Sequence, residues 1–102
     1  MAKLYAIYGQ PVDPVAFDAH YRQVHVPLAR QVPGLRRYEV TRGPVMGMSG
    51  PHATYMVATL EFDSMAAIGA ALASPEGQAT AADLANFASG GVDLMMAETE
   101  TL

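Results

Sequence analysis

The segment between Asp13 and Gly34 constrains the fold more than any other, because it contains both the start and the stop signals of one long helix. Asp13 is a favourable N-cap, and Pro14 at the first helical position gives up only an N–H that a helix leaves unpaired. Pro33-Gly34 ends the helix. Apolar side chains at spacings of three and four share one helical face: Phe17, Tyr21, Val24, Leu28 and Val32.

The other elements are shorter, and their order limits the topology. Residues suited to a pleated surface predict four strands, over 4–8, 35–42, 53–62 and 92–98. Asp63 or Ser64 caps a short helix, and Ser74-Pro75-Glu76 starts a second helical segment. The stretch 43–51, rich in Gly and Pro, predicts a loop. This order is that of an α+β, ferredoxin-like βαββαβ protomer, with a four-stranded antiparallel sheet and helices on one face.

Helices on one face leave the other face of the sheet to be polar or to be covered by a partner. On the strand 53–62, one face holds Met56, Ala58, Leu60 and Phe62, and the other holds Tyr55, Val57, Thr59 and Glu61. The second set is mixed but includes Tyr and Val. We therefore expect a homodimer in which two sheets pack face to face. Each protomer is expected to be a single domain over residues 1–102, because a second domain would leave neither with an adequate core.

Composition excludes several classes of function. Ten Asp and Glu against six Lys and Arg give a net charge of −4, without the basic stripe of a nucleic-acid-binding protein. With no Cys, the chain has no disulfide, thiol nucleophile or thiolate metal site. No apolar run approaches the roughly 20 residues that span a bilayer, and no cleavable signal precedes the first strand. We expect a soluble cytoplasmic protein that does not bind membranes.

His25 is the histidine best placed for chemistry. It lies about 60° from the centre of the apolar helix face, so it can point under the sheet. Pro27 lacks the N–H that would bond to Gln23, so the helix should bend there and open a pocket. The alternative is a boundary histidine bonded to a backbone carbonyl. No metal site is predicted, because His20 and His25 are five residues apart and no supporting carboxylate is obvious.

Several segments resemble the EthD-like family of small dimeric α/β-barrel proteins, whose protomer is ferredoxin-like. The segments are Asp13-Pro14-Val15-Ala16-Phe17, Tyr21-Arg22-Gln23-Val24-His25-Val26-Pro27-Leu28-Ala29, Pro33-Gly34-Leu35-Arg36-Arg37-Tyr38 and Ser74-Pro75-Glu76-Gly77. The resemblance runs nearly end to end, and the His-x-Pro-Leu within the first helix is its most specific part. It implies a dimeric α/β barrel from a family named for ethyl tert-butyl ether degradation gene clusters.

The resemblance also implies a small aromatic, lactone or polyketide-like ligand and no cofactor. Similar proteins are cofactor-free isomerases and cyclases. In the methylmuconolactone isomerases, which look similar, the corresponding helix histidine is tied to the active site, and by motif that role falls on His25. Because this chain has no Cys, it cannot use a thiol as such relatives do.

These observations predict a proton-transfer site with His25 as general acid or base. Its imidazole exchanges a proton near pH 6.5, and partial burial would favour the neutral base. The residues expected to contact a ligand are Tyr8, Phe17, Tyr21, Tyr38 and Met56. For each tyrosine the alternative is core packing. Two other functions stay open: a non-catalytic dimeric protein that binds a ligand for a degradation pathway, and a cofactor-free quinol monooxygenase. The 43–51 loop is either a plain connection or a mobile flap.

Overall fold

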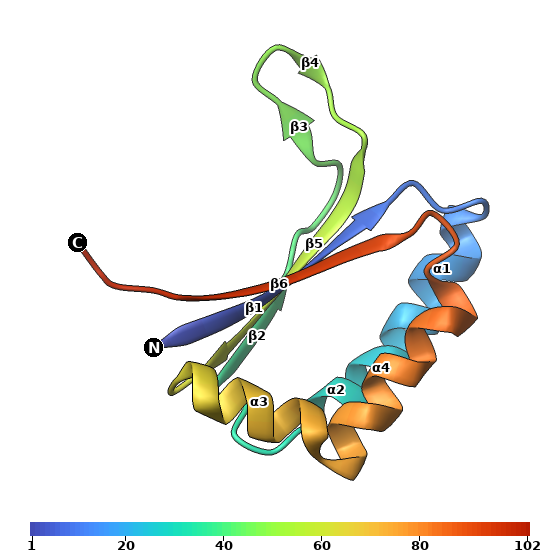
Figure 1. Ribbon diagram of the computed structural model, residues 1–102. Coiled ribbons are helices and arrows are strands. Elements are labelled where there is room, and N and C mark those ends of the chain that lie inside the picture. Colours follow the sequence, from blue (N-terminus) through green and yellow to red (C-terminus); the bar gives the residue numbers. More distant parts are fainter.

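The computed structural model describes residues 1–102 and contains a four-stranded antiparallel sheet with all helices on one face (Figure 1). The strands are β1 (Ala2–Gly9), β2 (Arg37–Val40), β5 (Thr54–Phe62) and β6 (Val92–Glu98). Their order across the sheet is β2-β5-β1-β6, with every neighbouring pair antiparallel. The expected α+β, ferredoxin-like fold is confirmed. The second strand is shorter than the predicted 35–42.

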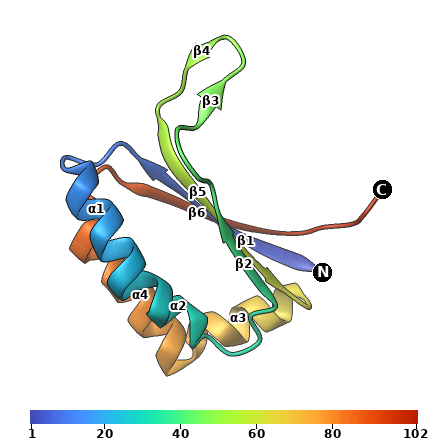
Figure 2. The ribbon, with the colours of Figure 1, turned by 180° about the vertical axis from the view of Figure 1, so that it is seen from behind.

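The helical layer has two parts, which Figure 2 shows from behind. The first contains α1 (Pro14–His20), a π-helical segment η1 (Tyr21–His25) and α2 (Val26–Arg30), and the second contains α3 (Met65–Ala73) and α4 (Pro75–Phe87). Predicted caps are confirmed: Asp13 accepts from the Ala16 N–H at 3.1 Å, and Ser74 accepts from the Gly77 N–H at 3.0 Å. No helix is long and apolar enough to cross a membrane.

The first helix differs from the prediction in its buried face. Val24 is 40% exposed, whereas His25 is only 5% exposed. The cause is the wide turn of η1, in which the Val26 N–H donates to the Tyr21 carbonyl five residues earlier. In a regular α-helix, residues four apart drift by about 40° around the axis. The wider turn cancels that drift, so Phe17, Tyr21, His25 and Ala29 share the buried face.

The helix-facing side of the sheet forms the core. Paired positions on β1 and β5 are Ala2 with Phe62, Leu4 with Leu60, Ala6 with Ala58, and Tyr8 with Met56. The prediction was wrong for Tyr55, which was placed on the opposite face. A register irregularity between Tyr8 and Gly9 turns Tyr55 to the helix side, where its ring contacts Phe17 with a centroid distance of 5.0 Å.

The predicted loop after β2 is a projecting arm with its own small hairpin. It contains β3 (Met46–Gly47) and β4 (Gly50–Pro51), which pair antiparallel. Figures 1 and 2 both show the arm extending away from the sheet and the helices. The Met48 side chain at its tip is fully exposed.

Candidate functional site

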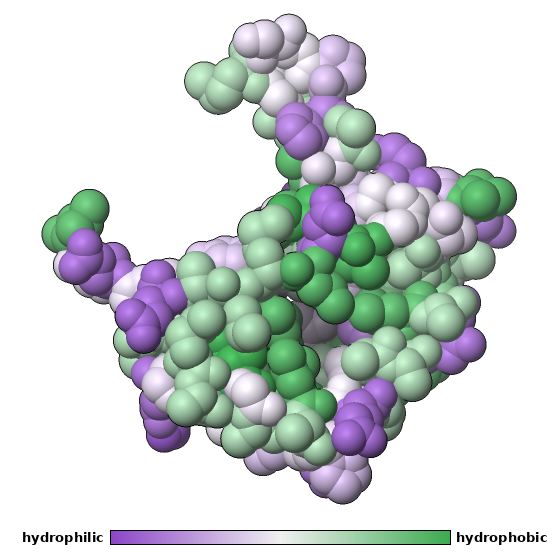
Figure 3. Space-filling model, viewed as in Figure 1, coloured by the Kyte–Doolittle hydropathy of each residue, from purple (hydrophilic) through white to green (hydrophobic).

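A cleft between the sheet and the helices encloses about 70 Å³. Aliphatic side chains from β1, β5, β6, α3 and α4 form most of its wall, and Figure 3 shows apolar side chains around a hollow on this side of the molecule. Its polar lining consists of Tyr8, Tyr21, Tyr38, His25 and Thr80. No carboxylate, lysine or arginine lines the cleft. A group held there is therefore in an apolar environment with hydroxyl and imidazole partners.

The π-helical turn places His25 at the wall of this cleft. Its Nδ1–H donates to Asp83 Oδ2 at 2.9 Å, because an ionised carboxylate can only accept. The imidazole also packs against Phe87, with a centroid distance of 4.7 Å, and against Tyr21 at 5.3 Å. No fully buried side-chain nitrogen lacks a partner, and Nε2 has no hydrogen bond within the protein, so this atom retains some accessible surface. His25 is one of the side chains that line the cleft. The lone pair of Nε2 is thus free to take a proton.

Asp83 on α4 is the centre of a hydrogen-bond network. Besides His25, it accepts from His20 Nε2 at 2.9 Å and from Asn86 Nδ2 at 3.0 Å. Its side chain is only 5% exposed. Burial alone would raise the pKa of Asp83, but the hydrogen bonds from Asn86, His20 and His25 together lower it below its ordinary value. The carboxylate therefore stays ionised and fixes the tautomer and orientation of His25.

The pKa of His25 is lowered from its ordinary value of 6.5 because burial disfavours the imidazolium. The hydrogen bond and the charge of Asp83 oppose this effect without cancelling it, and His20 adds to it. His25 is consequently neutral at neutral pH. A neutral imidazole whose Nδ1–H is held by a carboxylate can act as a base at Nε2.

Three phenols complete the polar lining of the cleft. Tyr21 Oη and Tyr38 Oη lie 2.5 Å apart and share a hydrogen bond between η1 and β2. Burial raises the pKa of Tyr8, Tyr21 and Tyr38 above the ordinary value of 10.0. All three hydroxyls are protonated at neutral pH. Because Tyr21 and Tyr38 share one hydrogen bond, one of these two hydroxyls and that of Tyr8 are left to donate to an oxygen that gains negative charge.

The structure brings together four of the six predicted site residues: His25, Tyr8, Tyr21 and Tyr38. Phe17 lies instead in the aromatic core, with its ring centroid 5.4 Å from that of Tyr8 and 5.1 Å from that of Phe87. Met56 lies beyond the cleft, in a second pocket.

Asp83 is the residue that sequence reasoning missed: no carboxylate beside His20 and His25 is obvious in the sequence, and the structure places Asp83 against both. Its sequence signal was an acidic residue in the buried register of α4, between Thr80 and Phe87. His20 Nε2 and His25 Nδ1 both form hydrogen bonds with the carboxylate of Asp83. No group of three His, Cys, Asp or Glu side chains is arranged to hold a metal ion.

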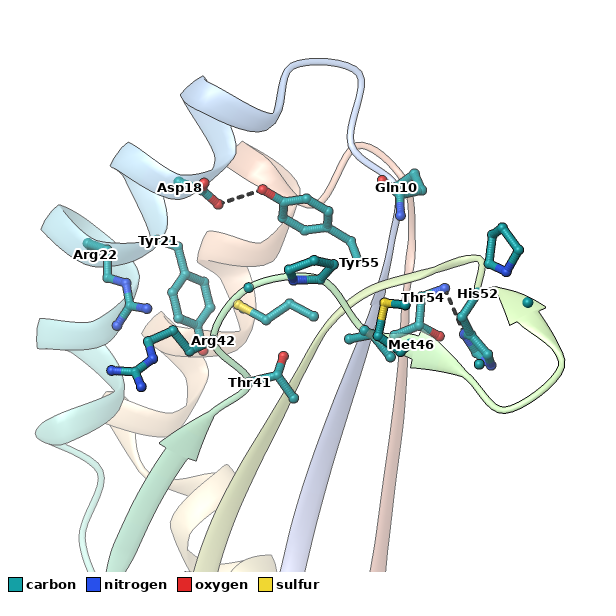
Figure 4. A pocket seen from close by; sticks show the side chains of 17 residues that line it. Gln10, Asp18, Tyr21, Arg22, Thr41, Arg42, Met46, His52, Thr54 and Tyr55 are labelled. Atoms are coloured by element: carbon teal, nitrogen blue, oxygen red, sulfur yellow. Dashed lines mark hydrogen bonds between the residues drawn. The ribbon is translucent and has the colours of Figure 1, made fainter.

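The second pocket lies beside the cleft, beneath the arm, and encloses about 790 Å³ (Figure 4). The first helix, the start of β5 and the segment after β2 surround it. Tyr21 lines both spaces, so they adjoin at this side chain. Tyr55 spans this pocket and donates to Asp18 Oδ1 at 2.8 Å, as the dashed line in Figure 4 marks.

Comparison with known proteins gives one family. The family model for the EthD domain matches residues 9–91. An uncharacterized 11.0 kDa protein from the thcB-thcC intergenic region of Rhodococcus erythropolis is 46% identical over 103 residues, covering 100% of this chain and 98% of that protein. The crystal structure of an EthD family protein from Bacillus halodurans is 38% identical, with a TM-score of 0.90, covering 98% of this chain and 99% of that one.

A more distant structure shares the fold alone. A mutant of SnoaB, a cofactor-independent oxygenase from Streptomyces nogalater, is 17% identical with a TM-score of 0.65, covering 99% of this chain and 93% of that one.

Proposed function

This chain belongs to the EthD family, and on that premise we propose that it transfers a proton on a small, mostly apolar molecule without a cofactor. His25 is the general base and acid. The observation that carries the proposal is the 2.9 Å hydrogen bond from His25 Nδ1 to the buried Asp83, which leaves Nε2 free in an apolar cleft. The ligand is an aromatic, lactone or polyketide-like compound.

The proposed step begins with loss of a C–H proton next to a carbonyl. The proton moves to His25 Nε2, and the electron pair of the broken bond moves onto the carbonyl oxygen as an enolate. The imidazolium that forms is stabilised by Asp83, and the enolate oxygen accepts a hydrogen bond from a phenol of the cleft. In a ligand with a carbon–carbon double bond beside the deprotonated carbon, the enolate is conjugated with that bond, and His25 returns the proton to the far carbon, which shifts the double bond and completes an isomerisation. If the enolate carbon first attacks a second carbonyl, the same base completes a cyclisation.

We also propose that the protein is a homodimer that closes a dimeric α/β barrel through the helix-free face of the sheet. On that face, Ile7 pairs with Val57 and Tyr5 pairs with Met95, which gives an apolar centre. Met95 is half exposed in the protomer. A Met95→Glu variant should sediment as a monomer, whereas the matched Met48→Glu variant in the arm should not differ from the wild type. Monomeric wild-type protein at all concentrations would contradict this proposal.

A non-catalytic binding role is the second candidate, and the size of the cleft favours it. The cleft encloses about 70 Å³, whereas a cavity that binds benzene measures about 150 Å³. A protein that only holds a ligand for a partner enzyme would not need to enclose the ligand completely.

Thermal stabilisation by a panel of phenols, quinols, lactones and aromatic ketones tests the site. His25→Gln is the site variant, since Gln keeps a donor for Asp83. Glu76→Gln, on the exposed first turn of α4 and outside both pockets, is its control. Ligands should raise the Tm of the wild type and of Glu76→Gln by several degrees and leave His25→Gln unchanged.

Proton transfer is then tested in D2O with a stabilising compound. Deuterium should enter the position next to the carbonyl with wild type and not with His25→Gln. Binding without deuterium exchange would favour the non-catalytic binding role. If the wild type binds none of the compounds, the proposed site is contradicted.

A further inference from the structure

Three of the five arginines, Arg22, Arg30 and Arg42, have no acidic partner. Arg36 and Arg37 are paired, with Asp63 at 2.8 Å and Glu39 at 3.2 Å. Arg22 on η1 and Arg42 just after β2 form no salt bridge, and both line the pocket beneath the arm. In a chain with a net charge of −4, this pocket is lined by two guanidinium groups and one carboxylate, that of Asp18, which leaves a local excess of positive charge.

In Figure 4 the guanidinium groups of Arg22 and Arg42 lie next to one another, beside Tyr21. Asp18, four residues before Arg22, lines the same pocket. Its carboxylate accepts from the Tyr55 hydroxyl at 2.8 Å and forms no salt bridge with either arginine, so the pocket keeps one positive charge in excess. The guanidinium groups repel one another and offer planar pairs of donors that match a carboxylate or a phosphate. An anion between them relieves the repulsion and uses those donors.

The volumes of the cleft beside His25 and of the pocket beneath the arm also indicate that part of a ligand lies near the two arginines. The cleft beside His25 holds less than an aromatic ring, so most of a ligand must lie outside it. The pocket beneath the arm is about ten times larger and shares Tyr21 with the cleft. Burial raises the pKa of Tyr21 and Tyr38, and the positive charge of Arg22 opposes that rise in both. The arginine therefore acts on the same hydroxyls that face the cleft.

We propose that Arg22 and Arg42 bind the anionic group, a carboxylate or a phosphate, of a ligand whose uncharged part reaches His25. This inference rests on the proposed function and names its substrate class as an amphipathic molecule with one anionic end. Thr41, Thr54 and Gln10 line the same pocket and supply neutral polar partners for the rest of the ligand. Residues at the base of the arm also line this pocket, so the bound ligand lies between them and the first helix.

Calorimetric titration with three aromatic probes tests the proposal: benzoate, phenyl phosphate and the neutral benzamide. The variants are Arg22→Gln, Arg42→Gln and the double variant, with Arg37→Gln on the helix-free face as the matched control. The affinity for an anionic probe should fall about fivefold with each substitution and further in the double variant. Benzamide should bind all five proteins equally, and Arg37→Gln should bind all probes as the wild type does.

The pattern of outcomes separates this proposal from the function on which it rests. Tighter binding of phenyl phosphate than benzoate identifies a phosphate end, and the reverse identifies a carboxylate end. If His25→Gln still binds the anions and the wild type transfers no proton, the arginine site is supported and the proposed catalytic function is not. Equal binding of benzoate and phenyl phosphate by the wild type and the double variant would overturn the proposal. So would failure of both anions to bind the wild type at about 10 mM.

Discussion

The helix-covered face of the sheet and the β3–β4 arm differ in how firmly their side chains are held. Around His25, every buried side-chain nitrogen and oxygen has a hydrogen-bond partner, and the rings of Tyr21 and Phe87 pack against the imidazole. In the arm, two strands of two residues each pair with one another, and Met48 has no packing partner. A proton-transfer group needs the fixed geometry of the first region, whereas an arm over a pocket needs freedom to adapt to a ligand.

The largest expected effect comes from breaking the helix-covered region at Gly77. A Cβ there would lie 2.0 Å from the Ala71 carbonyl oxygen, and backbone cannot move away as a side chain can. Gly77→Ala should lose about 3 kcal/mol or more of unfolding free energy in urea denaturation. The matched Gly69→Ala, which meets no atom within 4 Å, should gain about 0.5–1 kcal/mol. Equal midpoints for the two variants would contradict this account of the α3–α4 junction.

Removing the carboxylate of Asp83 should have the next largest effect. Asp83→Ala leaves the donors of His20, His25 and Asn86 without their shared acceptor. We expect a loss of about 2–3 kcal/mol in urea denaturation at pH 7. Asp83→Asn should lose less, because its amide oxygen still accepts. If Asp83→Ala were as stable as the wild type, the network would contribute nothing to the fold.

The pH dependence of stability should come from this region too. His25 takes up a proton near pH 6.5 in the unfolded chain but only at lower pH when folded, because burial lowers its pKa. The unfolded state then binds more protons, so stability is complete above about pH 6.5 and falls as the pH falls toward the folded pKa. The lowered pKa of Asp83 adds a loss of the same sign at lower pH. The Tm of the wild type should fall between about pH 7 and pH 5 more steeply than that of His25→Gln, and parallel curves would refute the assignment.

A smaller effect distinguishes the two histidines that share Asp83. Burial is the main cause of the low pKa of His25, and the charge of His20 adds to it. His20→Gln keeps a donor for the carboxylate and removes that charge. The NMR titration midpoint of His25 should therefore rise. His52→Gln should leave it unchanged, and an unchanged midpoint in His20→Gln would mean that the two imidazoles are not coupled.

The arm should show the smallest effect. Met48→Ser alters a fully exposed side chain, so the unfolding free energy should change by less than about 0.5 kcal/mol. Urea denaturation at several protein concentrations checks this. A loss above about 1 kcal/mol that grows on dilution would show that the arm packs against a second copy of the chain.

Local signals in the sequence were sufficient for most of the fold. Asp13, Pro14, Ser64 and Ser74 mark helix starts through contacts within one turn, so they could be identified from spacing alone. The alternation of Met56, Ala58, Leu60 and Phe62 likewise fixed one face of β5. Tyr55 could not be placed this way, because the bulge that turns it depends on the pairing with β1.

The sequence by itself determined the order of elements, the long first helix and the histidine on it that the cleft contains. Only the tertiary structure decided what that histidine touches. Asp83 lies 58 residues from His25 in the chain, and no periodicity relates positions on two different helices. The π-helical turn that places His25 on the buried face could not be predicted from the sequence either. A local pattern records repeating spacings, whereas these contacts arise when separate elements pack together.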